Sequence, residues 1–432
     1  MPKFFLFFLS FIIFNQVNAE LRIEITKGTN DPIRIGIVPI EWKADIPNFI
    51  YLHEVITQDL EFVGEYEVIR PEQMLSFPSN EEELYYRDWR LLDVDFLIFG
   101  EALNSNPINS SAQDIEVTYF IYDIARQKKL HKAHIKGNSK SIRSLAHGIS
   151  DGIYKKISGI PGIFSTKILY VDGSSSSNKE YYLRVCDFDG MNDQLLLTSD
   201  APIISPSWSS DGKHIAYVSF EMGSSTIYTQ SIESGQRKLI KPQQGINSSP
   251  VWSSNSKYIA AVLSREGNTD IYKYHTKRKS WERLTKHYGI DTEPDWSRNS
   301  KKIIFTSNRS GSPQIYELRL SSGRIKRLTF KGSYNARGRY LPDGENIVYV
   351  HRERGVFHIA KQNLISGKIK ILTKTNLDES PTISPNGNLI MYATKVEGKS
   401  VLAGISIDGS VSFVLPSNTG EVIEPSWSPF LN

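Results

Sequence analysis

The chain has 432 residues, and its 51 Lys and Arg against 47 Asp and Glu leave a formal net charge of +4. This small excess, with no long basic run or stripe standing out in the sequence, argues against nucleic acid as a partner. The only cysteine, Cys186, excludes an intrachain disulfide and with it a small disulfide-stapled domain; we expect it to be buried and inert.

Residues 1–19 have the pattern of an export signal. Lys3 supplies the positive start, residues 4–14 form an apolar run, and Ala19 ends a small-residue cleavage site. Because the apolar run is too short to span a bilayer, we expect cleavage before Glu20 and a soluble mature protein without direct membrane insertion.

Residues 20–31 form a separate N-terminal segment. Charged and apolar side chains alternate over its first six positions, which predicts a short strand. Such a strand is either a plain edge strand of the neighbouring small domain or a segment that a partner's sheet captures, and both arrangements can occur at different times.

Residues 32–160 read as an α/β domain. We expect strands at 33–40, 66–69 and 95–100, a hairpin of 114–122 with 129–136, and helices at 46–62, 81–92 and 141–157, the second one capped by Ser79 and Asn80. Proline and glycine at 158–162 mark the boundary with the next domain.

Residues 161–432 repeat one pattern at one interval. Trp208, Trp252 and Trp296 are 44 residues apart, each two residues after a proline and directly before a serine, and the pattern continues at Tyr340, Ile383 and Trp427. Each unit has a turn and several short strands rich in β-branched and aromatic residues. A repeat of this length is typical of a β-propeller blade. We expect the tryptophans to pack between neighbouring blades.

The number of strands predicts how the ring closes. Five repeat starts have room for four strands each, but Trp427 has room for one strand before the chain ends, and the strand at 167–171 has no tryptophan strand before it. Segment 422–430 should therefore supply the innermost strand of the first blade. The expected fold is an N-terminal α/β domain followed by a six-bladed β-propeller closed by its C-terminal strand.

Three motifs that resemble catalytic or metal sites have better explanations. The 148–152 segment matches the nucleophile elbow of hydrolases, but its Ser150 falls inside a helical stripe. The 187–193 segment resembles a calcium loop but fails the glycine and glutamate positions, and a hairpin turn fits better. His131 and His134 fall on opposite faces of a strand. We expect no enzymatic activity, no cofactor and no metal site.

Several specific pieces are spread along nearly the whole mature chain: ELRIEI at 20–25, IGIVP at 35–39, LRVCDFDG at 183–190, HIAKQNL at 358–364, LDESP at 377–381 and the ending PSWSP at 425–429. Together they resemble the TolB family of the Tol-Pal system. The resemblance implies a periplasmic adaptor, a monomer within a hetero-complex, that joins the outer-membrane lipoprotein Pal to the inner-membrane protein TolA. Its implied role is outer-membrane integrity and invagination during cell division.

The resemblance also implies two binding sites. TolA would engage the N-terminal segment, Glu20, Leu21, Arg22, Ile23, Glu24 and Ile25. Pal would bind the loops that enter the innermost strands, at 199–205, 245–249, 289–293, 333–337, 376–380 and 420–424. The expected Pal contacts are Ile246, Ser249, Asp291, Thr292, Glu293, Asp378, Glu379 and Glu424. Two alternatives stay open: a propeller that binds a small ligand or carbohydrate in its channel, and an accessory propeller of a peptidase.

Overall fold

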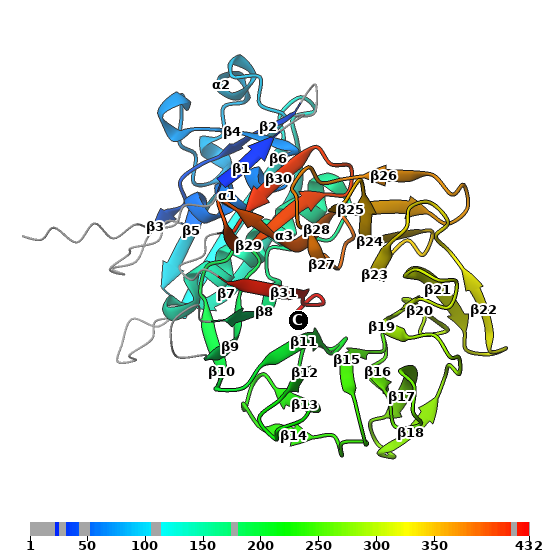
Figure 1. Ribbon diagram of the computed structural model, residues 1–432. Helices are drawn as coiled ribbons and strands as arrows, with labels where there is room; N and C mark the ends of the chain where they lie inside the picture. Colours follow the sequence, from blue (N-terminus) through cyan, green and yellow to red (C-terminus); the bar gives the residue numbers. More distant parts are fainter. Residues whose placement is uncertain are drawn as a thin grey trace, which may run out of the picture.

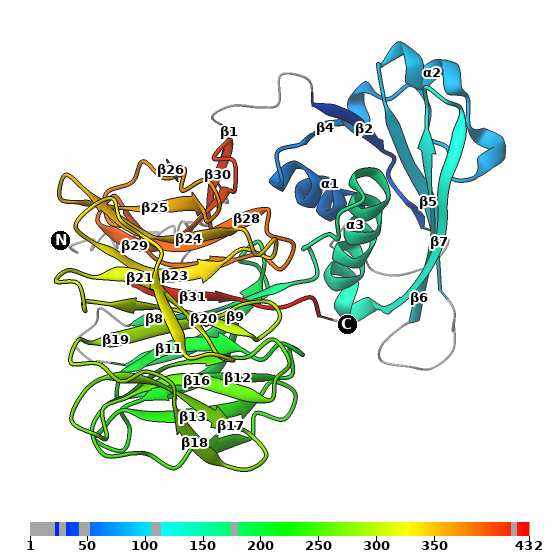
Figure 2. The same cartoon turned by 90° about the vertical axis from the view of Figure 1, so that its right-hand side faces the viewer.

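The computed structural model describes residues 22–25, 32–42, 52–104, 114–173, 180–415 and 421–431. The predicted signal 1–19, with Glu20 and Leu21, lies outside these ranges. Six sheets form a ring, and an α/β domain packs against one side of it (Figures 1 and 2). No helix in the described ranges is long and apolar enough to cross a membrane.

The small domain is one sheet with strand order β4-β2-β5-β6-β7, and β3 pairs with β5. Its strands are β2 (Ile33–Ile37), β3 (Glu41–Trp42), β4 (Tyr66–Ile69), β5 (Phe96–Asn104), β6 (Asp114–Asp123) and β7 (Lys128–Asn138). Helices α1 (Leu52–Phe62) and α3 (Ile142–Ser158) bury their apolar stripes on one face. Helix α2 (Tyr86–Leu91) covers the other face through Trp89.

The predicted strand at 66–69, the hairpin and the third helix are confirmed. The helix predicted at 81–92 is wrong in its first half, where the chain forms a 3-10 turn, Glu81–Glu83, and α2 starts only at Tyr86. Asn80 caps that turn by accepting from the Glu82 amide at 3.0 Å, and Glu83 accepts from the Ser79 amide at 2.8 Å. These local side-chain bonds compete with a continuous helix.

Five blades use four consecutive strands each. The outer three strands of the first blade come first in the chain, and these five blades follow in chain order. The bounds are β8 (Lys167–Gly173), β9 (Tyr181–Asp187), β10 (Gln194–Ser199), β11 (Ile203–Trp208), β12 (His214–Ser219), β13 (Thr226–Ser231), β14 (Arg237–Leu239), β15 (Asn247–Trp252), β16 (Tyr258–Leu263), β17 (Asp270–His275), β18 (Ser280–Arg283), β19 (Asp291–Trp296), β20 (Lys302–Ser307), β21 (Gln314–Arg319), β22 (Arg324–Arg327), β23 (Asn335–Tyr340), β24 (Asn346–Glu353), β25 (Val356–Asn363), β26 (Ile369–Ile371), β27 (Glu379–Ile383), β28 (Leu389–Val396), β29 (Lys399–Ser406) and β30 (Val411–Val414).

The last strand closes the ring as predicted. Strand β31 (Val422–Trp427) pairs antiparallel with β8, with Trp427 opposite Ile168, and becomes the innermost strand of the first blade. The repeat tryptophans pack between blades: the Trp208 indole nitrogen donates to the Ser426 carbonyl at 3.0 Å, and that of Trp296 donates to the Val251 carbonyl at 3.1 Å. These two indoles thus bond the second blade to the first and the fourth blade to the third at the inner rim.

The two domains share one hydrophobic core. The Phe62 ring at the end of α1 lies 4.9 Å from Phe188 and 4.2 Å from Phe413, both in the propeller. The same cluster includes Trp427 and the buried thiol residue Cys186. Because this contact is apolar and continuous, the small domain is held rigidly on the propeller.

Candidate partner-binding face of the propeller

The propeller has one face turned toward the small domain and one turned away from it. On the near face, Asn386 and Asn388 of the β27–β28 turn donate to the Pro161 carbonyl (3.0 Å) and the Tyr154 hydroxyl (3.2 Å). The loops that enter the innermost strands lie at the opposite ends of those strands (Figure 2). We call this far side the loop face; it comprises 199–205, 245–249, 289–293, 333–337, 376–380 and the described part of 420–424.

One residue per blade on the loop face has a left-handed backbone. These six positions have φ between 48° and 54°, and five of them precede a proline: Ser205, Ser249, Glu293, Arg337, Ser380 and Glu424. Each lies where the register of the inner strand shifts. A bulge of this kind re-aims a side chain, and all six residues line the central cavity of about 540 Å³.

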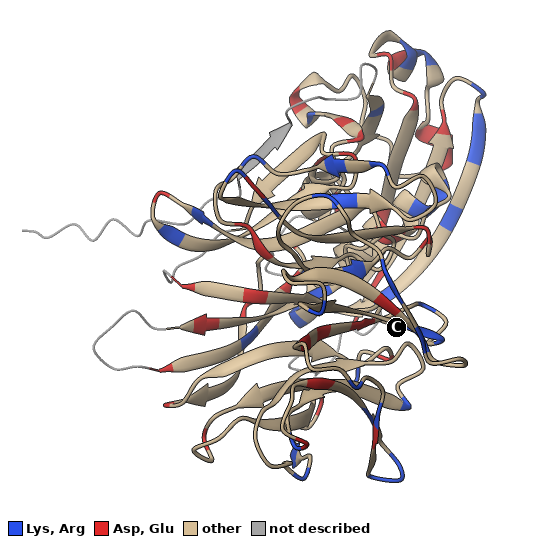
Figure 3. Ribbon diagram, turned by 45° about the vertical axis from the view of Figure 1, so that its right-hand side comes forward, with Lys and Arg blue, Asp and Glu red and all other residues tan. Residues whose placement is uncertain are grey.

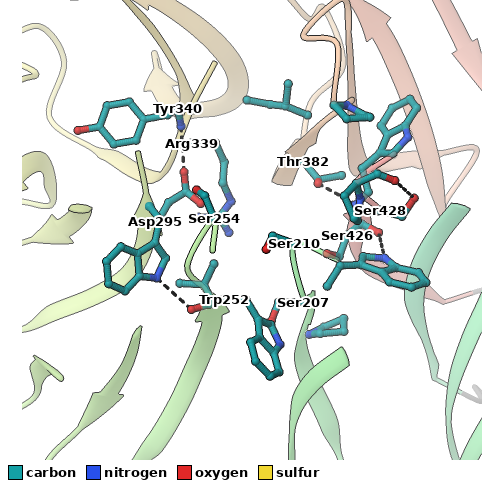
Figure 4. A pocket seen from close by; sticks show the side chains of 18 of the residues that line it. Ser207, Ser210, Trp252, Ser254, Asp295, Arg339, Tyr340, Thr382, Ser426 and Ser428 are labelled. Atoms are coloured by element: carbon teal, nitrogen blue, oxygen red, sulfur yellow. Dashed lines mark hydrogen bonds between the residues drawn. The ribbon is translucent and has the colours of Figure 1, made fainter. Parts of the chain in front are cut away.

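The mouth of this cavity carries a network of charges. The Arg337 guanidinium lies 3.1 Å from a Glu293 oxygen and 3.5 Å from a Glu424 oxygen, and it also donates to the Ser380 hydroxyl. Deeper in the channel, Asp295 and Arg339 line the same wall (Figure 4). Burial raises the pKa of Asp295 against the opposing effect of Arg339. Two of the expected Pal contacts, Glu293 and Glu424, therefore stand at the channel mouth, already partnered by one arginine.

Asp291 and Asp378, expected as Pal contacts, have no exposed surface. Asp291 accepts from both the Arg309 guanidinium (2.7 Å) and the Ser307 hydroxyl (2.6 Å). Asp378 accepts from the Thr394 hydroxyl at 2.7 Å and from two further threonine hydroxyls. Their burial argues against direct contact with a partner: each carboxylate is directed into the protein, where it holds its own loop in place.

A periodic signal in the sequence marks this anchoring role. Asn247 and Asn335 stand 44 residues before and after Asp291, each as the first residue of an inner strand. Both are buried and bond their own loops: Asn247 donates to the Gln243 carbonyl at 2.8 Å and Asn335 to the Lys331 carbonyl at 2.9 Å. A polar residue that recurs at the repeat interval indicates a structural position.

The remaining expected contacts reach the surface, and the structure adds a set that the sequence reasoning missed. Ile246 is 47% exposed, Glu379 is exposed, and Thr292 is half-buried. The added residues are large and apolar on the same loops or directly beside them: Tyr288 (85% exposed), Ile290 (49%), Phe330 (71%) and Leu377 (41%). Apolar side chains gathered on one face of a soluble protein mark an interaction site. Their presence in loops that should be polar was the signal available in the sequence.

The N-terminal segment lies on the propeller. Residues 22–25 form β1 (Arg22–Ile25), which pairs antiparallel with β30 as a fifth strand of the sixth blade, with Ile23 opposite Phe413. The alternative of an edge strand of the small domain is therefore wrong. The pairing covers four residues at a sheet edge, a position from which a strand can be released or captured.

A buried charge network joins the domains behind the loop face. His147 of α3 lies 2.8 Å from Asp59 of α1 and 3.8 Å from Asp187 of the propeller, and Lys167 lies 2.7 Å from Asp187. Burial alone would lower the pKa of His147, but the nearby carboxylates of Asp187 and Asp59 outweigh it and raise the pKa to about 9. Burial would raise the pKa of Asp187, but the cationic side chains of His147 and Lys167 beside it lower this pKa to about 2.

In the same region, three of the described residues have side chains of the kind that can bind a metal ion. Ligand atoms of Asp59, His147 and Asp189 lie within 4.8 Å of one another. Their charges are already balanced by protein cations, because His147 is protonated and Arg143 pairs with Asp189. The arrangement acts as an ion network between α1, α3 and the β9–β10 turn.

Comparison with known proteins identifies the family. A model of the TolB amino-terminal domain matches residues 21–130, and one of the TolB beta propeller domain matches 154–431. The curated relatives include the Tol-Pal system protein TolB of Hahella chejuensis, 55% identical over all of both chains, and that of a Marinomonas species, 56% identical over 98% of this chain and 97% of the relative.

The chain belongs to the TolB family of Tol-Pal system proteins.

The crystal structure of TolB from Acinetobacter baumannii agrees in fold, with a TM-score of 0.83 and 36% identity over 95% of this chain and all of that one. The match extends over most of this chain and so includes both of its domains.

Proposed function

We propose that the protein is a periplasmic adaptor of the Tol-Pal system, exported by its cleavable N-terminal signal. In this role it binds Pal through the loop face and TolA through residues 20–25, and it supports outer-membrane integrity and invagination during cell division. The observation that carries the proposal is the set of exposed apolar side chains on the loop face, carried by loops that buried polar residues hold in place. A rigid scaffold with exposed apolar loops suits protein recognition.

The Pal site combines an apolar part with an acidic one. Tyr288, Ile290 and Phe330 supply the apolar area, and Glu379 with the partly neutralised pair Glu293 and Glu424 supplies the acidic part. Exposed aromatics of this kind are typical anchors of protein interfaces. Ile246, Ser249 and Thr292 complete the proposed contact surface.

Calorimetric titration with Pal tests this site. Phe330→Ser removes an exposed anchor and should weaken binding at least about tenfold. Thr292→Arg adds a bulky charge between anchors and should also weaken it. Ile365→Ser is the matched control, because Ile365 is 77% exposed in the β25–β26 turn on the opposite face. Equal affinity for all three variants and the unsubstituted protein would remove the loop face from the Pal site.

The TolA site uses the exchangeable strand β1. Because β1 is bonded to the propeller over four residues at an edge, another protein's sheet can replace β30 as its partner. Deleting residues 20–31 should abolish TolA capture in a pull-down and leave Pal binding intact. Undiminished TolA capture by the shortened protein would count against this site.

The proposed role is protein binding. The structure does not support the nucleophile-elbow match at 148–152 on which a hydrolase function would depend. Ser150 is buried within α3, where its hydroxyl donates to the Ala146 carbonyl at 3.0 Å. A nucleophile elbow instead needs a strand before the serine and an exposed hydroxyl. A peptidase assay on the purified protein should give no signal above that of a Ser150→Ala variant.

A further inference from the structure

The outer strand of the small domain carries a basic stripe that the sequence reasoning did not recognise. Residues 124–150 contain seven Lys or Arg and no Asp or Glu, although the whole chain has a net charge of only +4. Strand β7 lies in this stretch, and Lys128, Lys129, Lys132, His134 and Lys136 are all exposed. Figure 3 shows several Lys or Arg positions in blue along the strand at the right-hand edge of the molecule. The expectation that the chain has no basic stripe is therefore wrong.

The same strand is a free sheet edge. β7 runs for 11 residues at the end of the order β4-β2-β5-β6-β7, and among the described residues it pairs only with β6. In an antiparallel edge strand, alternate residues direct their backbone amide and carbonyl groups outward. Helix α3 covers one face of β7, where Gly137 packs against Leu145. The open side is therefore the backbone edge itself.

The side chains of β7 decide which strand can dock there. Lys132 lies over the Phe120 ring at 5.1 Å, opposite Phe120 in the register, and Lys136 pairs with Glu116 across the strands. Both therefore stand on one face of the strand and are exposed to solvent, and Glu116 is the acid directly opposite Lys136. Lysines on an edge strand disfavour pairing with positively charged or uncharged strands, including a second copy of β7. The same charges attract a strand of opposite sign.

We propose that β7 is a second partner-binding site, which accepts an extended acidic peptide segment as an added strand. The backbone edge supplies the hydrogen bonds, and Lys132 and Lys136, four residues apart on one face, select glutamate or aspartate on the incoming chain. This site lies on the small domain, apart from both the loop face and β1, and does not depend on the function proposed for them.

Fluorescence anisotropy of the mature protein tests the site. The probe is a short labelled peptide that alternates glutamate with valine or threonine. We expect it to bind, and Lys132→Glu/Lys136→Glu to weaken binding at least about tenfold by placing like charges on both strands. Lys277→Glu/Lys279→Glu makes the same charge change in an exposed propeller turn and should alter binding by less than about twofold. If the glutamate variant unfolds, Lys132→Gln/Lys136→Gln replaces it and should still weaken binding.

Two further probes separate strand addition from plain charge attraction. A peptide with alternate backbone nitrogens methylated keeps its carboxylates but loses its donors, and it should bind poorly. Equal binding of the methylated peptide, equal losses in both double variants, or no binding of the acidic peptide would each overturn the proposal. Retention on anionic phospholipid vesicles through Lys132 and Lys136, without peptide binding, would assign the stripe to a membrane surface instead.

Discussion

The charge network between the domains predicts a pH-dependent stability that depends on one histidine. His147→Gln removes the cation that Asp59 and Asp187 share, while keeping a polar side chain of similar size. His147 has its pKa raised from 6.5 to about 9. A group whose pKa is raised on folding stabilises the protein fully below its unfolded value, and this contribution is lost as the pH rises through the folded value.

The expected size follows from the shift. A rise from 6.5 to about 9 corresponds to about 3 kcal/mol of stability. The unfolding free energy of the unsubstituted protein minus that of His147→Gln should therefore fall by about 3 kcal/mol between roughly pH 6.5 and pH 10. Asp187, with its pKa lowered to about 2, stays ionised throughout this window and adds no slope of its own.

Urea unfolding followed by tryptophan fluorescence measures this difference, because titratable groups away from position 147 behave alike in both proteins and cancel. The control is His351→Gln in the propeller: His351 is also buried, bonds Asn335 at 2.7 Å, and has its pKa lowered by burial. The unfolding free energy of the unsubstituted protein minus that of His351→Gln should change by less than about 0.5 kcal/mol over the same pH range, and in the opposite direction. A His147→Gln difference that stays constant or grows with pH would show that His147 is neutral in the folded protein.

Three further predictions concern the scaffold. Removing residues 422–432 deletes β31 and opens the ring, so small-angle scattering should show an expanded particle and thermal unfolding should broaden; an unchanged profile would contradict ring closure. A Cβ at Gly404 would lie 1.8 Å from the Phe413 ring, so Gly404→Ala should lower the unfolding free energy by about 1–3 kcal/mol, and Phe413→Leu in the same chain should restore part of it. Arg309→Ala leaves the buried Asp291 unpaired and should cost about 3–5 kcal/mol in urea unfolding, whereas a loss below 1 kcal/mol would show that the pair is solvated.

The propeller could be predicted because its sequence pattern repeats at a fixed interval. The 44-residue interval from Trp208 onward places each inner strand, and the single strand left at Trp427 requires a partner at the other end of the array. The helix at 81–92 failed because the bonds of Ser79 and Asn80 to the first glutamates are local chemistry that a hydrophobic stripe does not report.

The site was harder to predict because it depends on contacts across the fold. The alternation at residues 22–25 fits any open sheet edge, so nothing in it selects β30. Asp291 and Thr292 are neighbours in one loop, yet only the first is buried against Arg309. His147 meets Asp59 and Asp187 only after the domains dock, and no spacing in the sequence encodes that docking.

Hydrogen exchange of the mature protein with and without Pal tests the adaptor account most directly. We predict slower exchange of amides in the six loops of the loop face on Pal binding, with β7 and α2 unaffected. Protection confined to the small domain, or to the propeller face that carries Asn386, would place Pal elsewhere and contradict the account.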